Sequence, residues 1–523
     1  MTLFKRILVL FVFMLLILGH VSYNPSEAQS EDSPIVIGTL DLPVVLDPAT
    51  ADTFVEWEIL SHLYVGLTRQ VQGSVEYELA AASSHEVSSN GLIHTFTLRE
   101  DLIFSDGTPI TAQTFVNSIQ RVRTLNEGGA SIVNSAVVDV VALDERTIQF
   151  ELVSAIPYFE ALLSLPPFFA VHPKDFSAGQ VSEGQDSLIG NGIYVLQSYE
   201  VGPVFNLVPN PNYQFGDPPK NSGIVLRYYS DTEALRLAVL NGEVDVAWRD
   251  VRLPDAVETA NTQNEIEITI VPSTRMWYLL INMSQLFAEV NSDSIFREVL
   301  VHMLDRELVT QNYFDGLLTP AYSLVPALVG DAYYPIYSTY DDPQEALTVL
   351  TENGYSPNRP LSISIVTSQE TYGSYRANAI NTLRTGLVPV ARYINVSVST
   401  NYPAIEFIER LQEGAFSSAV FAYTPLVPHV DAYLRPLTHS ESLIVRENNY
   451  AQSEVDILLN QARQMTDIDE QNAAYRDAQA LIQSSNTLVP LWQDVVSVLY
   501  RSDIGGVVLE SNYFLHYDQL TRQ

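Results

Sequence analysis

Alternation of apolar and polar residues near the start of the chain predicts a strand, a turn and a helix, in that order. Residues 93–98 alternate between two faces with the period of a half-buried strand. Residues 105–109 (Ser-Asp-Gly-Thr-Pro) favour a turn, because Asp can bond its own backbone and Gly tolerates positive φ. Thr111 can cap the helix that follows, in which the apolar positions between 115 and 122 keep helical spacing.

The same patterns continue to the C-terminus and predict short strands that alternate with helices. Gly242 and Gly354 follow last helical turns, and Pro343 stands at a first helical position. Such alternation implies a mostly parallel sheet in the second half, covered on both faces. The other predicted strands are 35–37, 137–143, 147–152, 244–248, 361–365, 394–398 and 419–423. The other predicted helices are 54–63, 231–241, 294–304, 342–353, 375–387, 404–412, 454–465 and 470–482.

Composition indicates a globular chain with an acidic surface. The 523 residues include 27 Lys and Arg against 62 Asp and Glu, a net charge of −35, and 46% of the residues are hydrophobic. This length accommodates about two to four domains with buried cores, and the apolar content excludes a disordered chain. A surface this negative repels nucleic acid and anionic lipid, so we expect neither as a partner. Solubility alone explains the acid excess equally well.

The N-terminus has the features of a secretory signal. Lys5 and Arg6 precede an unbroken apolar run at 7–18, too short for a comfortable membrane span, and Ser26-Glu27-Ala28 offers a cleavage site. We therefore predict a signal peptide at 1–28, cleaved after Ala28, and a mature protein in the periplasm or outside the cell. The chain has no Cys, which excludes disulfides and the lipobox of a lipoprotein. A retained signal that serves as an anchor is the alternative.

The ordered motifs of the chain resemble one protein family. Leu-Arg-Glu-Asp at 98–101, followed by Phe-Ser-Asp-Gly-Thr-Pro-Ile-Thr-Ala at 104–112, resembles a signature of the large extracytoplasmic solute-binding proteins of ABC importers, family 5. Oligopeptide-, dipeptide- and nickel-binding proteins belong to this family. Leu46-Asp47-Pro48 with Tyr-Val-Gly-Leu at 64–67 resembles its opening motif. Residues 190–219 resemble its strand, hairpin and Asn-x-Asn-Tyr loop, and 273–282 and 488–492 resemble its crossing strands.

The resemblance extends over essentially the whole mature chain and implies its fold. We expect an α/β chain with the two-lobed type II fold of periplasmic binding proteins and an additional smaller α+β domain. The implied first lobe is discontinuous and consists of 33–69, 186–275 and 489–523. The extra domain, 70–185, is inserted in that lobe, and 276–488 forms the second lobe.

No enzyme motif supports a catalytic function. The chain lacks the G-x-S-x-G, G-x-x-x-x-G-K-[ST], G-x-G-x-x-G and H-E-x-x-H patterns, and it lacks the thiols of cysteine catalysis. His429 and Asp431 could form a metal pair, but two ligands make no site. We therefore expect no catalytic residue, no metal and no cofactor.

The function implied by the resemblance is capture of a peptide or other small solute between two lobes. Hinge closure would enclose the solute, and the receptor, a monomer, would deliver it to an ABC permease with its ATPase subunits. Trp248 ends a predicted strand, where ligands of α/β sheets gather, although a tryptophan at a core edge is equally consistent. The implied ligand-contacting residues are Asp52, Thr53, Phe54, Trp248, Asp250, Trp277, Asn282, Tyr423 and Thr424.

One departure from the family leaves the ligand open. Peptide binders have an aspartate shortly after the position of Thr424 that holds the amino terminus of the peptide, and here no aspartate precedes Asp431. A peptide is the first expectation, and similar proteins carry sugars, nickel chelates and other solutes. Two other function classes remain: a secreted hydrolase that uses a carboxylate pair in the same cleft, and a sensor or holding chaperone without transport.

The cleavage site gives a direct prediction. Sequencing the N-terminus of the secreted protein should give Gln29 as the first residue, because the residues at 26 and 28 are small. A secreted protein that begins at Met1 would contradict it.

Overall fold

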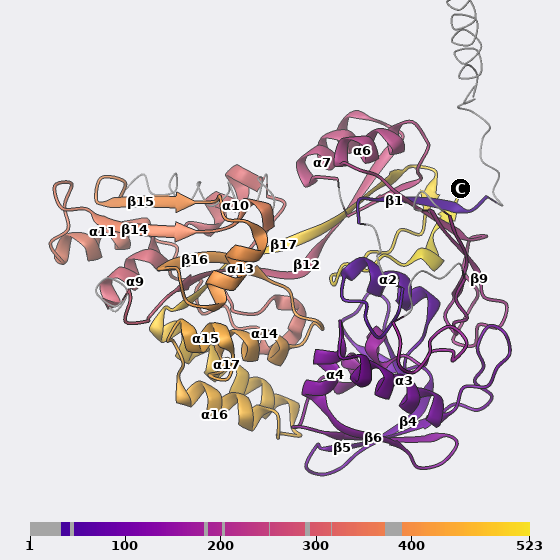
Figure 1. Cartoon of the computed structure of the whole chain (residues 1–523). Coiled ribbons are helices and arrows are strands. Elements are labelled where there is room, and N and C mark those ends of the chain that lie inside the picture. Colours follow the sequence, from indigo (N-terminus) through magenta and orange to yellow (C-terminus); the bar gives the residue numbers. More distant parts are fainter. Residues whose placement is uncertain are drawn as a thin grey trace, which may run out of the picture.

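The computed structural model has two halves that two long strands connect (Figure 1). It describes residues 33–41, 46–181, 187–200, 204–249, 251–287, 293–314, 316–371 and 390–523. The predicted signal peptide, Asp250 and the predicted helix 375–387 lie outside these ranges. None of the helices within these ranges combines the length and the apolar character that crossing a membrane requires.

One sheet of 11 strands runs through both halves of the described chain, in the order β15-β14-β16-β12-β17-β11-β1-β10-β9-β8, with β13 beside β17. The strands of the first half are β1 (Ile35–Thr39), β8 (Tyr194–Glu200), β9 (Val204–Pro209), β10 (Ile224–Tyr228) and β11 (Val246–Trp248). Those of the second half are β13 (Thr319–Pro320), β14 (Leu361–Val366), β15 (Ile394–Ser399) and β16 (Ser418–Tyr423). The connecting strands are β12 (Ile266–Ile281) and β17 (Leu488–Arg501).

The sheet is mixed, which corrects the prediction of a mostly parallel sheet. β14 pairs in parallel with β15 and β16, and β1 pairs in parallel with β10 and β11. β12 is antiparallel to both β16 and β17. The physical reason lies in the path of the chain, which leaves the first half along β12 and returns along β17, so these neighbours run in opposite directions.

The pairing of β12 with β17 is interrupted midway between the two halves. It runs from Ile266 opposite Arg501 to Leu280 opposite Leu488, and its register shifts twice, between Pro272 and Met276 and again between Met276 and Tyr278. The resemblance indicated a crossing strand at 273–282, whereas β12 begins at Ile266 and lies in both halves. We call the segment Pro272–Met276, with the residues opposite it on β17, the hinge.

A second sheet, of four strands in the order β4-β5-β7-β6, lies at the end of the first half opposite β1 and the connecting strands (Figure 1). Its inward residues, such as Phe96 and Phe150, are fully buried and belong to one apolar cluster that also contains Ile35 and Ile37 of β1. The core of this sheet is therefore continuous with the core of the first half, and the division at residues 70 and 185 stays a prediction. The strands are β4 (Ala82–Val87), β5 (Ile93–Leu98), β6 (Val137–Ala142) and β7 (Thr147–Leu152), and a hairpin of β2 (Thr68–Gln70) and β3 (Tyr77–Leu79) lies nearby.

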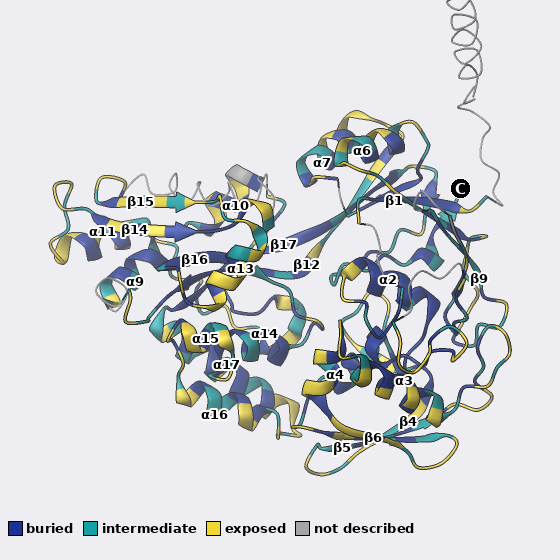
Figure 2. Ribbon diagram, in the orientation of Figure 1, coloured by how far each residue is buried: buried dark blue, intermediate teal, exposed yellow. Residues whose placement is uncertain are grey.

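Helices pack around the sheets, and most of them combine buried with exposed residues (Figure 2). In the first half these are α2 (Phe54–Leu63), α3 (Ala112–Leu125), α4 (Ala130–Ala136), α5 (Phe159–Leu162), η1 (Pro166–Phe168), α6 (Thr232–Leu240) and α7 (Leu253–Thr262). In the second half they are α9 (Ser294–His302), α10 (Arg306–Phe314), η2 (Ala327–Ala332), α11 (Pro343–Glu352), α13 (Ala404–Gln412), α14 (Val430–Thr438), α15 (Leu443–Glu447), α16 (Ser453–Ala462) and α17 (Ile468–Ser485). The chain ends in the first half with β18 (Ile504–Gly505), η3 (Tyr517–Gln519) and β19 (Thr521–Arg522).

The motif residues that carry the family resemblance hold the first half together. Asp47, of the Leu-Asp-Pro motif, accepts two hydrogen bonds from Arg121 of α3, at 2.7 and 2.5 Å. Both side chains are buried, and Arg121 also donates to the carbonyls of Ser177 and Gln180. A buried guanidinium is stable only when its donors are satisfied, so this pair fixes the loop after β1 against α3.

This buried pair gives a stability prediction. Asp47→Asn should lower the free energy of unfolding by about 3–5 kcal/mol, because it leaves the Arg121 charge buried without its counter-ion. The matched control is Glu100→Gln, which breaks an exposed bond to Arg146 and should cost less than about 1 kcal/mol. Urea unfolding of both variants measures the difference. Equal losses in the two variants would contradict the role given to Asp47.

Candidate functional site

A cavity of about 850 Å³ lies in the first half and reaches one loop of the second. Its walls are the end of α2, the β2–β3 hairpin, residues 213–220 and residues 510–519. Pro425 and Leu426, in the loop between β16 and α14, are the second-half residues among those that line it. The rings of Phe54, Trp57 and Tyr213 face it together with polar groups. Concave sites of this size with mixed walls are typical of small-molecule binding.

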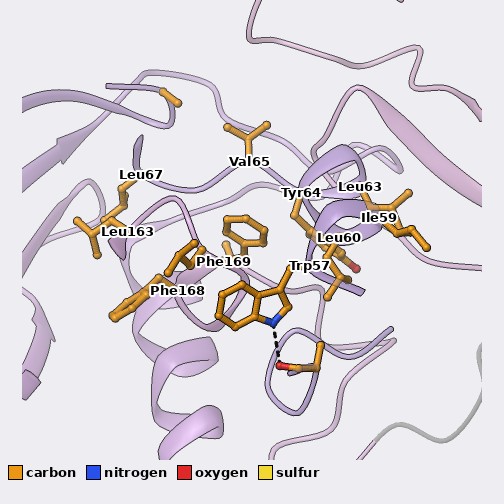
Figure 3. Packing of buried hydrophobic residues seen from close by; sticks show 14 of the residues in the cluster. Trp57, Ile59, Leu60, Leu63, Tyr64, Val65, Leu67, Leu163, Phe168 and Phe169 are labelled. Carbon is orange, nitrogen blue, oxygen red and sulfur yellow. Dashed lines mark hydrogen bonds between the residues drawn. The ribbon is translucent and has the colours of Figure 1, made fainter. Parts of the chain in front are cut away.

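Helix α2 positions the inner wall of this cavity. Thr53 accepts a hydrogen bond from the Glu56 backbone, and the Glu56 carboxylate accepts from the Thr53 backbone, which together form a capping box. The indole N–H of Trp57 donates to the carbonyl of Ala51 at 2.9 Å, the dashed line in Figure 3. This bond fixes the indole ring beside Phe169, which Figure 3 shows in the same cluster.

A buried carboxylate behind this wall connects α2 to two distant segments. Glu58 is fully buried and accepts hydrogen bonds from the indole of Trp248, at 2.9 Å, and from the hydroxyl of Tyr517. Arg249 donates to the same carboxylate at 3.0 Å. Burial raises the pKa of Glu58, and the charge of Arg249 and the two other donors offset part of that rise. These contacts fix the C-terminal segment against α2.

The polar wall of the cavity contains a histidine between two carboxylates. Nε2 of His516 lies 2.9 Å from Glu510, and Nδ1 lies 3.7 Å from Asp518. Burial alone lowers the pKa of His516, but its bonds to Asp518 and Glu510 outweigh burial and raise that pKa to about 9. The imidazole is therefore protonated at neutral pH. Glu510 also accepts the backbone N–H of Gly73 at 2.6 Å, so the cluster links the C-terminal segment to the β2–β3 hairpin.

The outer wall of the cavity consists of the β2–β3 hairpin and the loop after β9. Arg69 of β2 bonds Glu78 of β3 at 2.7 Å and the carbonyl of Phe215 at 2.6 Å. The rings of Tyr213 and Phe215 lie 5.7 Å apart in an edge-to-face arrangement. The wall thus combines aromatic faces with an exposed ion pair and can contact both apolar and polar parts of a solute.

Of the predicted contacts on the loop before α2, one lines the cavity. Phe54 is 40% exposed, lines the cavity and lies 5.9 Å from the ring of Tyr513. Asp52 and Thr53 are exposed, and their backbone N–H groups bond the carboxylate of the helix cap. Their positions place them beside the cavity, not in its wall.

Three other predicted contacts are buried and have protein partners. Trp248 donates to Glu58, as described above, and is 1% exposed. Trp277 is fully buried with its ring 5.7 Å from that of Trp492. Asn282 donates to two backbone carbonyls at 2.7 and 2.9 Å. Each of these side chains packs or bonds within the protein in this state.

The last predicted contacts lie beside the hinge. Tyr423 is half-buried and its hydroxyl donates to the carbonyl of Ala432 at 3.0 Å. Thr424 accepts from Arg275 at 3.1 Å, and this bond joins β16 to β12 near the register shift. Asp250 lies outside the described residues.

Sequence reasoning missed most of the cavity wall. The segments at 68–79 and 510–519 carry no motif, and the segment at 213–220 begins with the Tyr of the Asn-x-Asn-Tyr loop. The segment at 510–519 meets the others only because the chain returns to the first half along β17. The run Tyr513, Phe514, His516 and Tyr517 is the one sequence signal near them, since aromatic residues and histidine often line binding sites. His429 and Asp431, the weighed metal pair, have protein partners: His429 caps α14, and Asp431 is bonded to Arg463.

The comparisons with known proteins agree with the motifs. The model of the bacterial extracellular solute-binding proteins, family 5 middle, matches residues 76–443. A probable deoxycholate-binding periplasmic protein of Escherichia coli is 23% identical over 494 residues, 90% of this chain and 89% of that protein. The periplasmic murein peptide-binding protein of the same species is 24% identical over 504 residues, 91% of this chain and 90% of that protein.

A solved structure confirms the fold class. The murein tripeptide-binding protein in its unliganded open form superposes with a TM-score of 0.80 at 21% sequence identity, and the match covers 94% of this chain and 98% of that one. The α/β, two-lobed fold predicted from the motifs is therefore correct.

The protonated histidine in the cavity wall gives a pH prediction. The folded pKa of about 9 exceeds the ordinary value of 6.5, so the stability from His516 is fully present below about pH 6.5 and is lost as the pH rises through 9. Unfolding free energy measured between pH 6 and 10 should fall across this window in the natural protein. His516→Gln should flatten that part of the curve, whereas an unchanged slope would refute the charged state of His516.

Proposed function

The chain belongs to the bacterial extracellular solute-binding proteins of family 5, and on this premise we propose that it is the receptor of an ABC importer. It captures a peptide or another small solute between its two halves and delivers the solute to a membrane permease. The solute leaves the receptor chemically unchanged, so the protein is a receptor and not an enzyme.

The single observation that supports this proposal most is the composition of the cavity wall. Several segments of the first half and the β16–α14 loop of the second half line one cavity of about 850 Å³. A site that both halves build changes shape when the hinge moves. A solute that contacts both halves therefore binds better to the closed arrangement and favours it.

The β12–β17 pair provides the hinge for this closure. Strand pairing is continuous outside Pro272–Tyr278, the segment in which the register shifts twice, so each half moves as a packed body. The bending concentrates at Pro272–Met276, the longer of the two gaps in the pairing. Pro272 has no N–H to bond across the sheet, which makes this part of the ladder the easier one to bend.

The residues that we propose contact the solute are two aromatic side chains of the first half and one apolar side chain of the second. Phe54 and Tyr213 offer rings on the first half, and Leu426, which is 47% exposed, offers an apolar side chain on the second. Where peptide binders have an aspartate, this loop presents Pro425 and Leu426. The names of two relatives, one for deoxycholate and one for murein peptides, span the range from an amphipathic steroid to a peptide. A peptide and an amphipathic solute are the two classes to test.

The cellular location and the partners of the receptor follow from the same proposal. The receptor is secreted with its signal removed after Ala28, carries no lipid anchor because it has no Cys, and works as a monomer. A membrane permease and its ATPase subunits are its partners. They recognise the closed form, since that form differs in shape from the empty one.

Native mass spectrometry of the protein purified from its own host tests the proposal. We expect a bound solute of constant mass that is released intact, and small-angle scattering should show compaction when that solute is returned to the emptied protein. Leu426→Trp should reduce solute retention about tenfold or more, because a larger ring enters the cavity rim. Leu443→Trp is the control: it lies at a similarly exposed leucine outside the cavity and should retain the solute.

Two results would overturn the proposal. One is a protein that never compacts with any co-purified solute or with solutes of the two classes. The other is chemical turnover of the bound solute, which would favour a hydrolase.

A further inference from the structure

The two halves also meet away from the hinge, through side chains of the segment before α14 and the end of α16. Val427 and Ala432, from the segment that joins β16 to α14, are 1% and 6% exposed and belong to the apolar cluster of the first half. In Figure 1, the end of α16 in the second half lies next to the four-stranded sheet of the first half. The contact is therefore a packed one, with an apolar centre.

An arginine of the second half reaches across this contact. Arg463, at the end of α16, donates to the Asp431 carboxylate at 3.0 and 2.6 Å, and Asp431 is fully buried. Its third nitrogen donates to the hydroxyl of Ser154, 309 residues away on the first half, at 3.2 Å. Asp431, in α14, also accepts a hydrogen bond from the hydroxyl of Tyr475 in α17 at 3.3 Å. Residues of α14 and α17 therefore hold the Arg463 side chain in place.

An aromatic pair lies beside this bond. Tyr158, just before α5 in the first half, places its ring 5.1 Å from that of His429 in the second. His429 in turn caps α14, because its Nδ1 accepts the backbone N–H of Asp431 at 3.1 Å. The turn that begins α14 thus presents both the ring that meets Tyr158 and the carboxylate that holds Arg463.

From this geometry we propose that Ser154, Tyr158, His429, Asp431 and Arg463 form a latch that holds the two halves together in the empty receptor. The inference rests on the hinge of the proposed function and goes beyond it, because it needs no solute. The Arg463 guanidinium is already fixed by Asp431 within the second half. Forming the contact with Ser154 therefore immobilises few additional groups. The latch sets how much of the empty protein adopts the arrangement of this structure, and hence the apparent affinity for a given solute.

Distance measurement on the empty protein tests the latch. The chain has no Cys, so cysteines introduced at two exposed positions, Gln120 of α3 and Glu409 of α13, can be spin-labelled specifically. Pulsed electron resonance then reports the separation of the halves. We expect the empty protein to populate the separation of this structure, in which the latch is formed. Ser154→Ala and Arg463→Met should each reduce that population about threefold or more relative to the other separations, the scale of one hydrogen bond.

Two further variants isolate the cause. Tyr158→Ala, which removes the ring that meets His429, should act in the same direction. Arg446→Met is the matched control, because this arginine is exposed on α15 and pairs only with its neighbour Glu447 among the described residues; it should leave the distances unchanged. Ser154 is exposed, so Ser154→Ala keeps the fold even if Arg463→Met weakens it.

The outcomes separate the latch from the receptor function. Distances that are identical in the natural protein and in all three latch variants would overturn the latch, as would an empty natural protein that does not populate the separation of this structure. Added solute should close every variant if the proposed function is right. A solute that closes none of them would refute that function and leave the comparison of empty proteins to decide the latch.

Discussion

The structure depends on one pair of strands, β12 and β17, because each is part of the sheet in both halves. Their antiparallel pairing holds the halves together from Ile266 to Leu280, and its longest interruption lies between Pro272 and Met276. Ser273 and Thr274 at that place are buried, yet their backbone groups find partners outside the ladder: Gln493 donates to the Ser273 carbonyl at 2.7 Å and Tyr433 to that of Thr274 at 2.6 Å. The break thus leaves these buried carbonyls bonded, which allows a bendable point without an energetic penalty from bare polar groups.

Buried ion pairs fix the segments that the two strands bring back to the first half. Asp245 accepts two bonds from Arg522, at 3.0 and 2.7 Å, and also the backbone N–H of Val36. Together with Asp47–Arg121 and Glu58–Arg249, this pair connects parts of the chain that are far apart in sequence. With 27 basic against 62 acidic residues, the arginines in these pairs neutralise the buried carboxylates while the acid excess remains elsewhere. Removing one member leaves an uncompensated buried charge, so these contacts specify position as well as stability.

Sequence patterns predicted the helices and strands that depend on neighbouring residues. They failed for features that depend on contacts between residues far apart in the sequence. The helices 54–63 and 404–412 agree with α2 and α13, because caps and apolar spacing are local signals. Helix α7 was not predicted, since half of its sequence LPDAVETANT is polar and it buries only the narrow face of Leu253, Ala256 and Thr259. Trp248 was expected at the cleft from its place at the end of β11, but Glu58, 190 residues earlier, covers its indole N–H. The cavity itself was beyond prediction, because its walls meet only in the folded chain.

The cavity and the latch share one segment, and this couples them. Pro425 and Leu426 line the cavity, Val427 packs against the first half, and His429 and Asp431 belong to the latch, all within seven consecutive residues of the loop and α14. A change in the strength of the latch alters the population of this arrangement before solute arrives, so the apparent affinity for the solute changes with it. A stronger latch also slows every movement of the halves away from this arrangement, because the Arg463–Ser154 bond must break first. A receptor with this geometry therefore needs a latch of moderate strength, and a single arginine with one donor to Ser154 across the gap is consistent with that requirement.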